Sequence, residues 1–463
     1  MKQWANKYVL VLGLGETGLS LVNWLVAQGA RVRVADSRDK PPSIDIVRTQ
    51  FPQVDVRCGI FRKELLEGIE LIAISPGVPL RDPFVMKAVV MGIPVVGDIE
   101  IFALSLPKIN APKIIAITGS NGKTTVTSMV GKMCRAAGKE TEIAGNISPA
   151  VLDVLLRRGG KQPDVWVLEL SSFQLETTYS LNADAATVLN ISEDHLDRYN
   201  DLEAYIAAKS RIFRASGLGG VQVLNRDDAE SIAMGLLERK HITFGVISEP
   251  IDSENWGVEI DGADTWLVQG KHRVMKADEL MVEGRHNVSN ALASLALCSA
   301  IDLPLPPLLD ALRHFKGLPH RVEEVAEIKD VVYYDDSKGT NVGATVAALS
   351  GLSRRAVVIL GGDGKGQDFA PLAPAITKYA RAVVLIGRDA KLIAEALHSC
   401  DVPKLYANDM DEAVKLSAEK ARAGDAVLMS PACASFDMYR NYVHRAEAFI
   451  SAVRSLEGEP TWT

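Results

Sequence analysis

Short runs of apolar residues alternate along this chain with longer segments in which apolar residues recur every three or four positions. Apolar runs occupy residues 9–12, 113–117, 165–168, 186–191 and 331–334. Continuous apolar runs are typical of strands buried on both faces, and the three-to-four spacing is typical of amphipathic helices. The alternation therefore predicts an α/β protein whose parallel strands are joined by crossover helices.

Two proline-containing stretches divide this pattern into three blocks. Residues 105–112 and 315–321 place proline among polar or glycine residues, which is typical of linkers. The length of 463 residues is enough for about three domains. We expect a short antiparallel insertion near residues 252–272. The predicted domains are residues 1–108, 109–317 and 318–463.

The composition narrows the possible partners and compartment. The formal net charge is −7 with acids and bases interspersed, which argues against a nucleic-acid partner because such proteins carry a basic stripe. No apolar stretch reaches the length of about 18 residues that a membrane span needs. The five cysteines are scattered without a paired spacing, which favours a reducing cytoplasm over a disulfide framework.

A glycine-rich turn between a strand and a helix is the strongest chemical signal. Gly119 and Gly122 follow the apolar run 113–117, Lys123 and Thr124 come next, and a helical pattern follows through Val126, Met129, Val130 and Met133. Such a turn cradles phosphate with backbone N–H groups, a lysine and a Mg²⁺-binding threonine. The usual motif has a further glycine where this chain has Ile117, so an ordinary turn with a surface lysine is the alternative. The candidate phosphate-binding residues are Gly119, Ser120, Asn121, Gly122, Lys123, Thr124 and Thr125.

A second glycine cluster lies in the first block. Gly13, Gly15 and Gly18 follow a predicted strand and open a helix, and Asp36 ends the next strand, over residues 31–35. This spacing is typical of dinucleotide-binding folds. The residues are compatible with the cofactor site of a nicotinamide dehydrogenase. They are equally compatible with a site for any nucleotide joined through a diphosphate. The turn at residues 75–77 is a second anion contact at the same sheet edge or merely a turn.

Candidate metal ligands follow two strands of the second block. Glu169 ends the run 165–168, and His195 lies in an acidic segment after the run 186–191. Carboxylates at strand ends beside a phosphate loop are suited to Mg²⁺, although a solvated acidic loop is the simpler alternative. Asp201 is a good helix N-cap, and Lys209 lies in the apolar stripe of that helix. Lys209 either extends to solvent or, if buried, becomes a neutral amine that can take up CO₂ as a Mg²⁺-binding carbamate.

Ten segments together resemble one known family. They occur in the family's order and span nearly the whole chain: residues 117–125, 145–147, 168–176, 193–198, 207–209, 286–291, 318–321, 336–341, 361–365 and 430–435. The sequence resembles the Mur ligases of peptidoglycan synthesis. The resemblance implies three αβ domains: a Rossmann-like N-terminal domain, a P-loop ATPase-like central domain with a parallel sheet, and a Rossmann-like C-terminal domain.

The resemblance also implies an ADP-forming amide ligase that joins D-glutamate to UDP-N-acetylmuramoyl-L-alanine through an acyl phosphate and a tetrahedral intermediate. The first block would then bind UDP rather than NAD. Asn146 would contact the muramoyl substrate or the transferred phosphoryl group. The implied UDP-substrate residues are Gly15, Glu16, Thr17, Asp36, Ser37, Arg38, Ser75, Pro76, Gly77 and Asn146.

The remaining implied sites fall into three groups. ATP would be bound by the phosphate loop and by Asn287, Asn290, Arg321 and Asp336, and Lys123 would be catalytic together with His195, Lys209, Glu169 and Asn146. Two Mg²⁺ ions would be held by Thr124, Glu169, His195 and Lys209 as its carbamate. D-Glutamate would be bound by His195, Lys338, Thr340, Lys365, Ser435, Phe436 and Tyr442. We expect Ser435 at a helix N-terminus, and the family usually has leucine and phenylalanine at positions 436 and 442.

Several alternatives remain open from the sequence. A sibling ligase that adds diaminopimelate or lysine would carry an Asp-Asn-Pro-Arg type motif, which this sequence lacks. A folylpolyglutamate synthase would lack the first block. An NAD-dependent oxidoreductase and a non-catalytic nucleotide-binding regulator are the rivals of other classes. We expect a cytoplasmic monomer that binds neither nucleic acid nor membrane, and whose third block rotates to close over its ligands.

Overall fold

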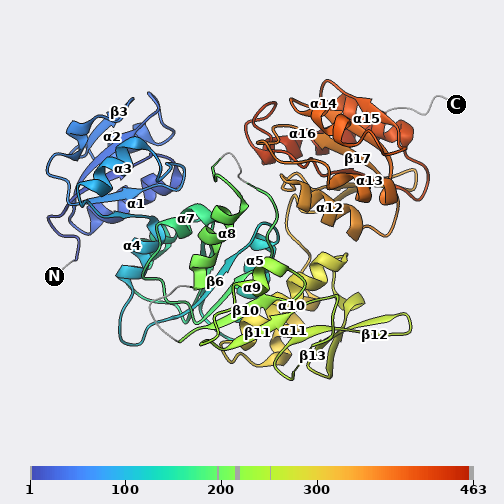
Figure 1. Cartoon of the computed structure of the whole chain (residues 1–463), viewed down its shortest axis with the longest axis horizontal. Helices are drawn as coiled ribbons and strands as arrows, with labels where there is room; N and C mark the ends of the chain where they lie inside the picture. The colour runs from blue at the N-terminus through green and yellow to red at the C-terminus, as the bar shows by residue number, and fades with distance from the viewer. Residues whose placement is uncertain (1–2, 195–197, 214–218, 251, 458–463) are drawn as a thin grey trace.

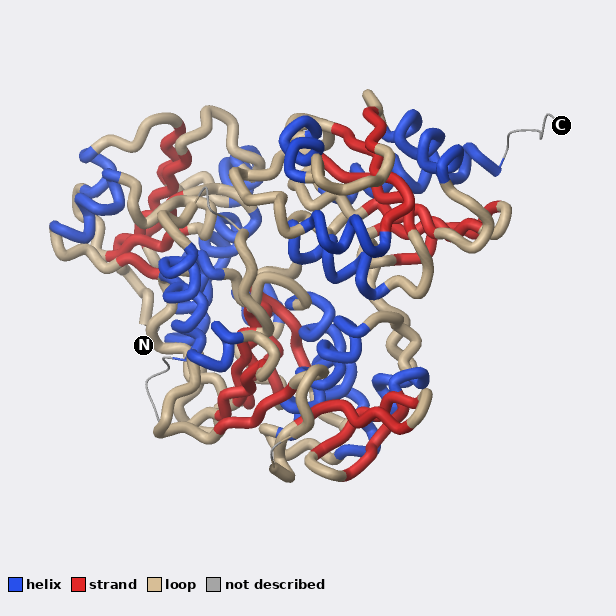
Figure 2. Tube along the Cα trace, turned by 45° about the vertical axis from the view of Figure 1, so that its right-hand side comes forward, coloured by secondary structure: helices blue, strands red, loops and turns tan. Residues whose placement is uncertain are grey.

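The computed structural model describes residues 3–194, 198–213, 219–250 and 252–457, which form three α/β domains, each built on its own sheet. In Figure 1 the first domain (blue) and the third (orange to red) lie on opposite sides above the second, and the turned view in Figure 2 shows the same arrangement. The predicted three-domain α/β class is confirmed, and the boundaries at residues 108 and 317 remain predictions. No helix within the described ranges is long and apolar enough to cross a membrane.

The first domain is a five-stranded parallel sheet in the order β3-β2-β1-β4-β5. Val9 and Val11 pack on the side of α1, and Leu10 and Leu12 pack on the side of α3, because successive strand residues face opposite sides. The strands are β1 (Tyr8–Leu12), β2 (Arg31–Asp36), β3 (Asp55–Cys58), β4 (Leu71–Ile74) and β5 (Val95–Val96). The helices are α1 (Glu16–Ala27), α2 (Ile44–Gln50), η1 (Lys63–Leu66), α3 (Pro83–Val90) and α4 (Asp98–Ser105).

The second domain has a nine-stranded sheet in the order β14-β13-β12-β11-β10-β9-β6-β8-β7. The last three strands in sequence pair antiparallel, which confirms the predicted insertion. The strands are β6 (Lys113–Thr118), β7 (Thr141–Gly145), β8 (Val165–Glu169), β9 (Ala185–Val188), β10 (Val221–Asn225), β11 (His241–Phe244), β12 (Trp256–Asp261), β13 (Asp264–Gln269) and β14 (His272–Lys276).

Helices cover both faces of the parallel part of this sheet. One hydrophobic core joins the sheet to α5 (Lys123–Ala136), α10 (Arg285–Ser299) and α11 (Leu305–Arg313), and it buries Val126, Met129, Val130 and Met133 of the predicted stripe. The remaining helices are α6 (Val151–Arg157), α7 (Ser172–Glu176), α8 (Leu202–Ser210), η2 (Arg211–Phe213), α9 (Ala229–Ala233) and η3 (Ala277–Glu279).

One strand is shorter than the sequence predicted. The apolar run 186–191 is extended only to Val188, because the chain then leaves the sheet to bond the glycine turn. The Asn190 carbonyl accepts from the Ser120 N–H at 2.9 Å, and its side-chain oxygen accepts from the Asn121 N–H at 2.8 Å. These bonds hold the glycine turn at the carboxyl edge of the sheet, beside the end of β9.

The third domain has a six-stranded sheet in the order β15-β16-β20-β17-β18-β19, parallel except for β15. The strands are β15 (Glu323–Ile328), β16 (Val331–Asp335), β17 (Ala356–Gly361), β18 (Ala380–Ile386), β19 (Lys404–Tyr406) and β20 (Ala426–Met429). One face packs on α12 (Val342–Gly351), α13 (Leu372–Tyr379) and α14 (Ala390–Ala396), and the other on α15 (Met410–Lys420) and α16 (Tyr442–Glu457).

Candidate active site

The glycine turn between β6 and α5 has a backbone that side chains would disrupt. Gly119 and Gly122 have φ angles of +152° and +82°, which residues other than glycine rarely adopt. A Cβ atom on Gly122 would also lie 2.6 Å from the Asn290 side-chain oxygen. The turn therefore brings its backbone close to α10, whose first turns carry Asn287 and Asn290.

Two lysines converge on one carbonyl oxygen of this turn. The Lys123 Nζ donates to the carbonyls of Gly119 and Ser120 at 2.8 and 2.9 Å, and the Lys209 Nζ donates to the Gly119 carbonyl at 2.9 Å. Burial lowers the pKa of Lys123, and burial together with the neighbouring Lys123 charge lowers the pKa of Lys209 well below its ordinary value. Two buried amines that share one oxygen bring several N–H donors together, which suits an anionic ligand.

Lys209 is buried rather than extended to solvent. It is 2% exposed, and its amine lies 4.6 Å from the centre of the Tyr205 ring. Asp201 is the N-cap of α8 as predicted, since its side chain accepts from the Ala204 N–H. Burial of Lys209 meets the condition that carbamate formation requires, although the carbamate itself remains a prediction.

Glu169 provides a carboxylate at the end of β8, beside these amines. It is 2% exposed, and its Oε1 accepts from the Asn146 side chain at 3.0 Å. Among the described residues, its Oε2 has no hydrogen-bond partner. A buried carboxylate oxygen without a partner is costly, so this atom fits a cation ligand. The other predicted ligand, His195, lies outside the described residues.

A cavity of 330 Å³ lies between the glycine turn, α10 and the start of the third domain. Lys338, predicted for D-glutamate, also lines it, whereas Gly119, Ser120, Lys123 and Thr124 are not part of its lining. The predicted ATP-binding residues that line it are Asn121, Gly122, Thr125, Asn287, Asn290, Arg321 and Asp336.

The third domain contacts the glycine turn directly. The Arg321 guanidinium donates to the Thr124 hydroxyl at 2.8 Å, and the Asn341 side chain donates to the Asn121 side-chain oxygen at 3.1 Å. Burial raises the pKa of Asp336 to about 7, although a hydrogen bond from Ser430 and the Arg321 charge both favour its carboxylate form. These groups close one end of the cavity with residues from two domains.

A separate cavity of 580 Å³ lies between the first and second domains. Burial alone would raise the pKa of Asp36, but hydrogen bonds from Arg38 and the Leu14 N–H hold it below its ordinary value. Every residue predicted for the UDP-linked substrate lines this cavity: Gly15, Glu16, Thr17, Asp36, Ser37, Arg38, Ser75, Pro76, Gly77 and Asn146.

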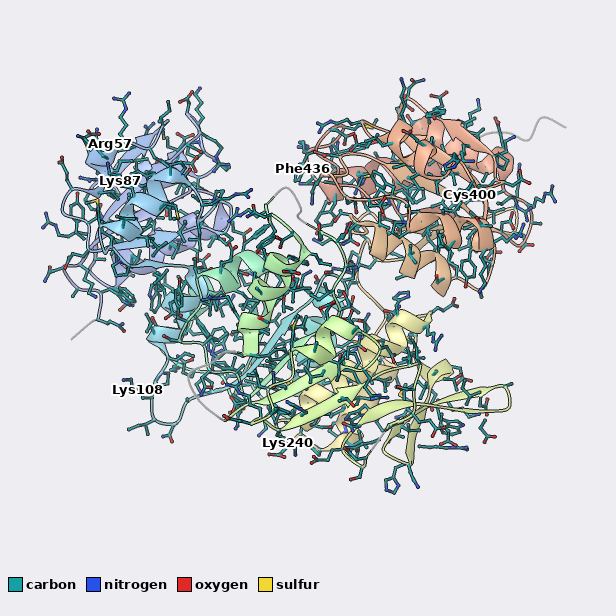
Figure 3. All side chains as sticks on the ribbon, viewed as in Figure 1. Arg57, Lys87, Lys108, Lys240, Cys400 and Phe436 are labelled. Carbon is teal, nitrogen blue, oxygen red and sulfur yellow. The ribbon has the colours of Figure 1, made fainter. Side chains whose placement is uncertain are left out.

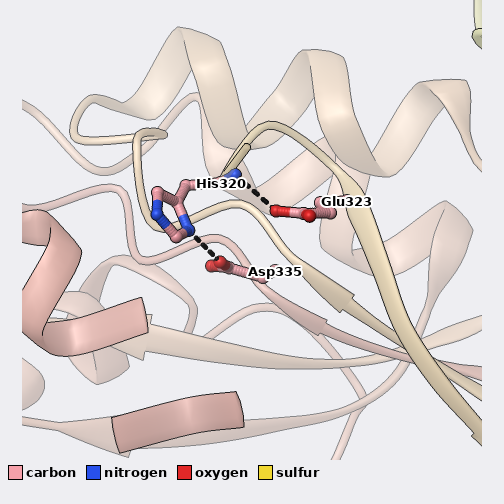
Figure 4. A group of neighbouring side chains, drawn as sticks. All are labelled: His320, Glu323 and Asp335. Atoms are coloured by element: carbon pink, nitrogen blue, oxygen red, sulfur yellow. Dashed lines mark hydrogen bonds and ion pairs between the residues drawn. The ribbon is translucent and has the colours of Figure 1, made fainter. Parts of the chain in front are cut away.

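A polar cluster orders the start of the third domain. His320 Nδ1 lies 2.6 Å from a carboxylate oxygen of Asp335, and Glu323 accepts from the His320 N–H at 2.8 Å (Figure 4). The three side chains are spaced closely enough to hold a metal ion, but Asp335 already bonds the His320 ring and Glu323 bonds the His320 backbone N–H. The Lys338 amine lies 3.8 Å from the centre of the Tyr442 ring, and burial lowers the pKa of Lys338 to about 8.

Thr340, predicted for D-glutamate, lies on the loop of Lys338 between β16 and α12, and Lys365, Ser435 and Phe436 lie on two further loops of the third domain. Backbone hydrogen bonds between Asp363 and Ala434 hold the loop of Lys365 beside the loop of Ser435 and Phe436. Phe436, labelled in Figure 3, is 71% exposed. The prediction that Ser435 lies at a helix N-terminus is wrong. Its carbonyl accepts from Met438 and Tyr439 in a separate turn, and α16 begins only at Tyr442.

Comparison with known proteins identifies the family. Three family models match: the Mur ligase MurD-like N-terminal domain over residues 7–97, the Mur ligase middle domain over 117–298, and the Mur ligase glutamate ligase domain over 320–433. The chain belongs to the Mur ligase family.

Individual Mur ligases resemble it over their full length. The chain is 57% identical to the UDP-N-acetylmuramoylalanine–D-glutamate ligase of Nitrosospira multiformis, over 98% of this chain and 96% of that protein. The enzyme of the same name from Methylobacillus flagellatus is 55% identical over 99% of both chains. The structure of UDP-N-acetylmuramate-alanine ligase MurC from Thermotoga maritima shares the fold, with a TM-score of 0.60 and 20% identity over 97% of this chain and 99% of that one.

The sequence motifs assigned no role to two residues of this Mur ligase, one in a cavity lining and one buried beneath the loops of the third domain. His286, on the first turn of α10, lines the 330 Å³ cavity beside the glycine turn, and burial lowers its pKa to about 4. Arg445 on α16 is 1% exposed and donates to the carbonyls of Ser337 and Cys433. His286 belongs to a segment that resembles the family, which is a signal for it. An arginine on an amphipathic helix carries no local signal of burial.

Proposed function

We propose that this Mur ligase adds D-glutamate to UDP-N-acetylmuramoyl-L-alanine in an ATP-dependent, ADP-forming reaction of peptidoglycan precursor synthesis. The observation that carries the proposal is the position of Asn146. It lines the cavity between the first two domains and also donates to Glu169 beside Lys123 and Lys209. One residue thus joins the cavity for a nucleotide-linked acceptor to the place where phosphate would be bound.

The choice of acceptor and amine rests on the relatives. The similar proteins of Nitrosospira multiformis and Methylobacillus flagellatus are named for the muramoylalanine acceptor and for D-glutamate. The first cavity presents Asp36 and Arg38 together with a glycine turn, which fits a nucleotide base and a diphosphate. The UDP-substrate residues would be the ten predicted from the sequence, all of which line this cavity.

The reaction needs cations because two anions must meet. The acceptor carboxylate attacks the γ-phosphorus of ATP, the bond to the β-phosphate oxygen breaks, and ADP leaves as an acyl phosphate forms. The D-glutamate amine then adds to the acyl carbon, loses a proton and expels phosphate. At ~4 Å and an effective dielectric near 20, each pair of unit charges repels by about 4 kcal/mol. Lys123 would neutralise part of this charge by moving from the turn carbonyls to the phosphates.

Magnesium would supply the rest of the positive charge. Glu169 and Thr124 would hold one ion, and His195 and Lys209 as its carbamate would hold a second. The Glu169 Oε2, which has no hydrogen-bond partner in the described part of the chain, supports the first site, and the buried amine of Lys209 supports the second. When bound, the ions would neutralise the γ-phosphate and the acceptor carboxylate as they approach.

The third domain would hold the amino acid. Lys338, Thr340, Lys365 and Ser435 would hold the two carboxylates of D-glutamate, and Phe436 and Tyr442 would shape the pocket, with His195 near its amine. Rotation of this domain toward the second would bring the two loops over the acceptor. We further propose a monomer that works in the cytoplasm, where nucleotide-linked precursors are made.

The test is release of orthophosphate by the purified chain with ATP and Mg²⁺. We expect release only when UDP-N-acetylmuramoyl-L-alanine and D-glutamate are both present, and not with L-alanine, L-lysine or D-alanyl-D-alanine as the amine. Lys123→Ala should abolish release, and Lys139→Ala, an exposed lysine just beyond the same helix, should not. Release that depends on another amine would overturn the substrate assignment. Absorbance change at the nicotinamide band would instead support an oxidoreductase.

A further inference from the structure

Several polar contacts between the first and second domains gather around α4 and α7. The Gln174 side chain donates to Asp98 at 3.0 Å, and Glu100 accepts from the N–H groups of Tyr179 and Ser180 at 2.6 and 2.7 Å. These contacts hold α4 of the first domain against the second domain. They do not touch the turn at residues 75–77, which lines the cavity for the UDP-linked acceptor.

Arg198 of the second domain contacts that turn. Its Nη1 donates to the Gly77 carbonyl at 3.3 Å, and its Nη2 donates to the Val78 carbonyl at 3.1 Å. The guanidinium lies 4.5 Å from the centre of the Phe173 ring and 3.8 Å from the Glu176 carboxylate, and the side chain is 12% exposed. A planar guanidinium fixed by a ring, a carboxylate and two carbonyls has one orientation.

Tyr199, the residue after Arg198, begins a series of aromatic contacts that extends to the glycine turn. Tyr199 packs on Phe173 and on Tyr205, with ring centres 5.9 and 5.4 Å apart. The Tyr205 hydroxyl lies 3.1 Å from the Ser120 hydroxyl of the glycine turn, and its ring lies under Lys209. Packed side chains therefore connect the turn of the first domain to Lys209 and the phosphate loop.

We infer that Arg198 is a positioning residue that docks the turn at residues 75–78 onto the second domain and so sets the distance between the bound diphosphate and the catalytic lysines. The inference rests on the proposed function. The acceptor would be held at one end by the first domain and must present its carboxylate at the second. A shift of about 1 Å between the two ends would lower turnover by about 100-fold, because reacting atoms must be within a near-attack distance.

The turn itself has other anchors, so loss of Arg198 should change the docking more than the shape of the turn. The Ser75 hydroxyl donates to the Gly13 carbonyl at 3.0 Å, the Ser75 N–H donates to Leu12, and the Val78 N–H donates to Ser75. Under the proposed function, UDP alone would be bound mainly by residues of the first domain, whose glycine turn, Asp36 and Arg38 line the cavity. Its binding should therefore be nearly independent of Arg198, whereas turnover of the full acceptor should not be.

The experiment compares Arg198→Ala and Arg198→Lys with a control, Asn23→Ala, which removes a hydrogen bond to Asp153 across the same domain boundary but away from the turn. UDP affinity is measured by calorimetry, turnover by phosphate release, and folding by the melting temperature. We expect kcat/KM for the acceptor to fall by about 100-fold in Arg198→Ala and about tenfold in Arg198→Lys. UDP affinity should stay within about threefold, and Asn23→Ala should match the parent chain.

Two results would overturn the inference: a loss of UDP affinity as large as the loss of turnover, or unchanged turnover in Arg198→Ala. Arg198→Lys keeps the positive charge. If Arg198→Ala melts at a much lower temperature than the parent chain, the comparison of turnover with UDP affinity is made on Arg198→Lys instead. If the parent chain binds UDP but releases no phosphate, the proposed function fails instead, and the two failures are distinguished.

Discussion

Arg321 of the third domain donates a hydrogen bond to the Thr124 hydroxyl in the first turn of α5, at 2.8 Å. Thr124 is the residue proposed to hold Mg²⁺ beside ATP. An arginine from one domain thus lies where a nucleotide and its cation would be bound by another. Arg321 is positioned to exchange this hydroxyl for a phosphate oxygen when ATP binds, since both are hydrogen-bond acceptors for a guanidinium.

Replacement of Arg321 by alanine should weaken ATP binding. Hydrogen bonds to charged groups contribute about 1.5–3 kcal/mol, so we expect the KM for ATP to rise by about 10- to 150-fold. UDP binding should not change, because Arg321 does not line the first cavity. Arg321→Lys should recover only part of the affinity, since lysine lacks the planar fork. An unchanged KM for ATP in Arg321→Ala would contradict the assignment.

Replacement of Lys209 by alanine should abolish phosphate release because the proposed carbamate would be lost. Lys209 is buried, and burial lowers its pKa well below the ordinary value, which favours the neutral amine, the form that can take up CO₂. Short-chain carboxylic acids should partly restore turnover of Lys209→Ala by supplying an anion in the vacated space.

The matched control for this rescue is Lys123→Ala, which loses a cation rather than the proposed anion. The same acids should not restore its turnover. Restoration of both variants, or of neither while both keep the parent melting temperature, would contradict a carbamate on Lys209. Mass spectrometry of the intact chain in bicarbonate would give an independent reading.

Use of D-glutamate should decline above pH 8 because of Lys338. Burial, together with the nearby Arg321 charge, lowers its pKa to about 8, so the ammonium that would hold a carboxylate is lost as the pH rises through that value. By pH 9 the protonated fraction is about one tenth, and kcat/KM for D-glutamate should fall about tenfold relative to Lys338→Arg, which stays charged. Parallel pH profiles for the two chains would contradict this role.

His286 should make the protein less stable in acid. Burial lowers its pKa to about 4, below the ordinary value of 6.5, so the unfolded chain takes up the proton first as the pH falls. Stability is therefore lost between pH 6.5 and 4, by about 2 kcal/mol at pH 5. Denaturant unfolding at pH 7.5 and pH 5 should show this loss in the parent chain and not in His286→Gln. An equal loss of unfolding free energy in the parent chain and in His286→Gln would show that protonation of His286 is not the cause.

The features that depend on local pattern could be predicted from the order of residues alone. Apolar runs predicted the strands before and after the glycine turn, since a buried parallel strand needs apolar residues on both faces. The spacing of Val126, Met129, Val130 and Met133 predicted the buried side of α5, and all four are buried. Asp201 was predicted as an N-cap because its short side chain can bond the first free N–H groups of a helix.

The pairs of side chains that contact one another could be found only from the folded molecule. The convergence of Lys123 and Lys209 on the Gly119 carbonyl, the bond from Asn146 to Glu169 and the reach of Arg321 to Thr124 join residues far apart in the chain. Ser435 was wrongly predicted at a helix N-terminus, because the turn that begins there does not continue into α16. Local periodicity carries no information about such pairs. Such pairs depend on how the three separately packed sheets dock against one another. Burial between segments far apart in the chain determines that docking, and spacing along the chain does not.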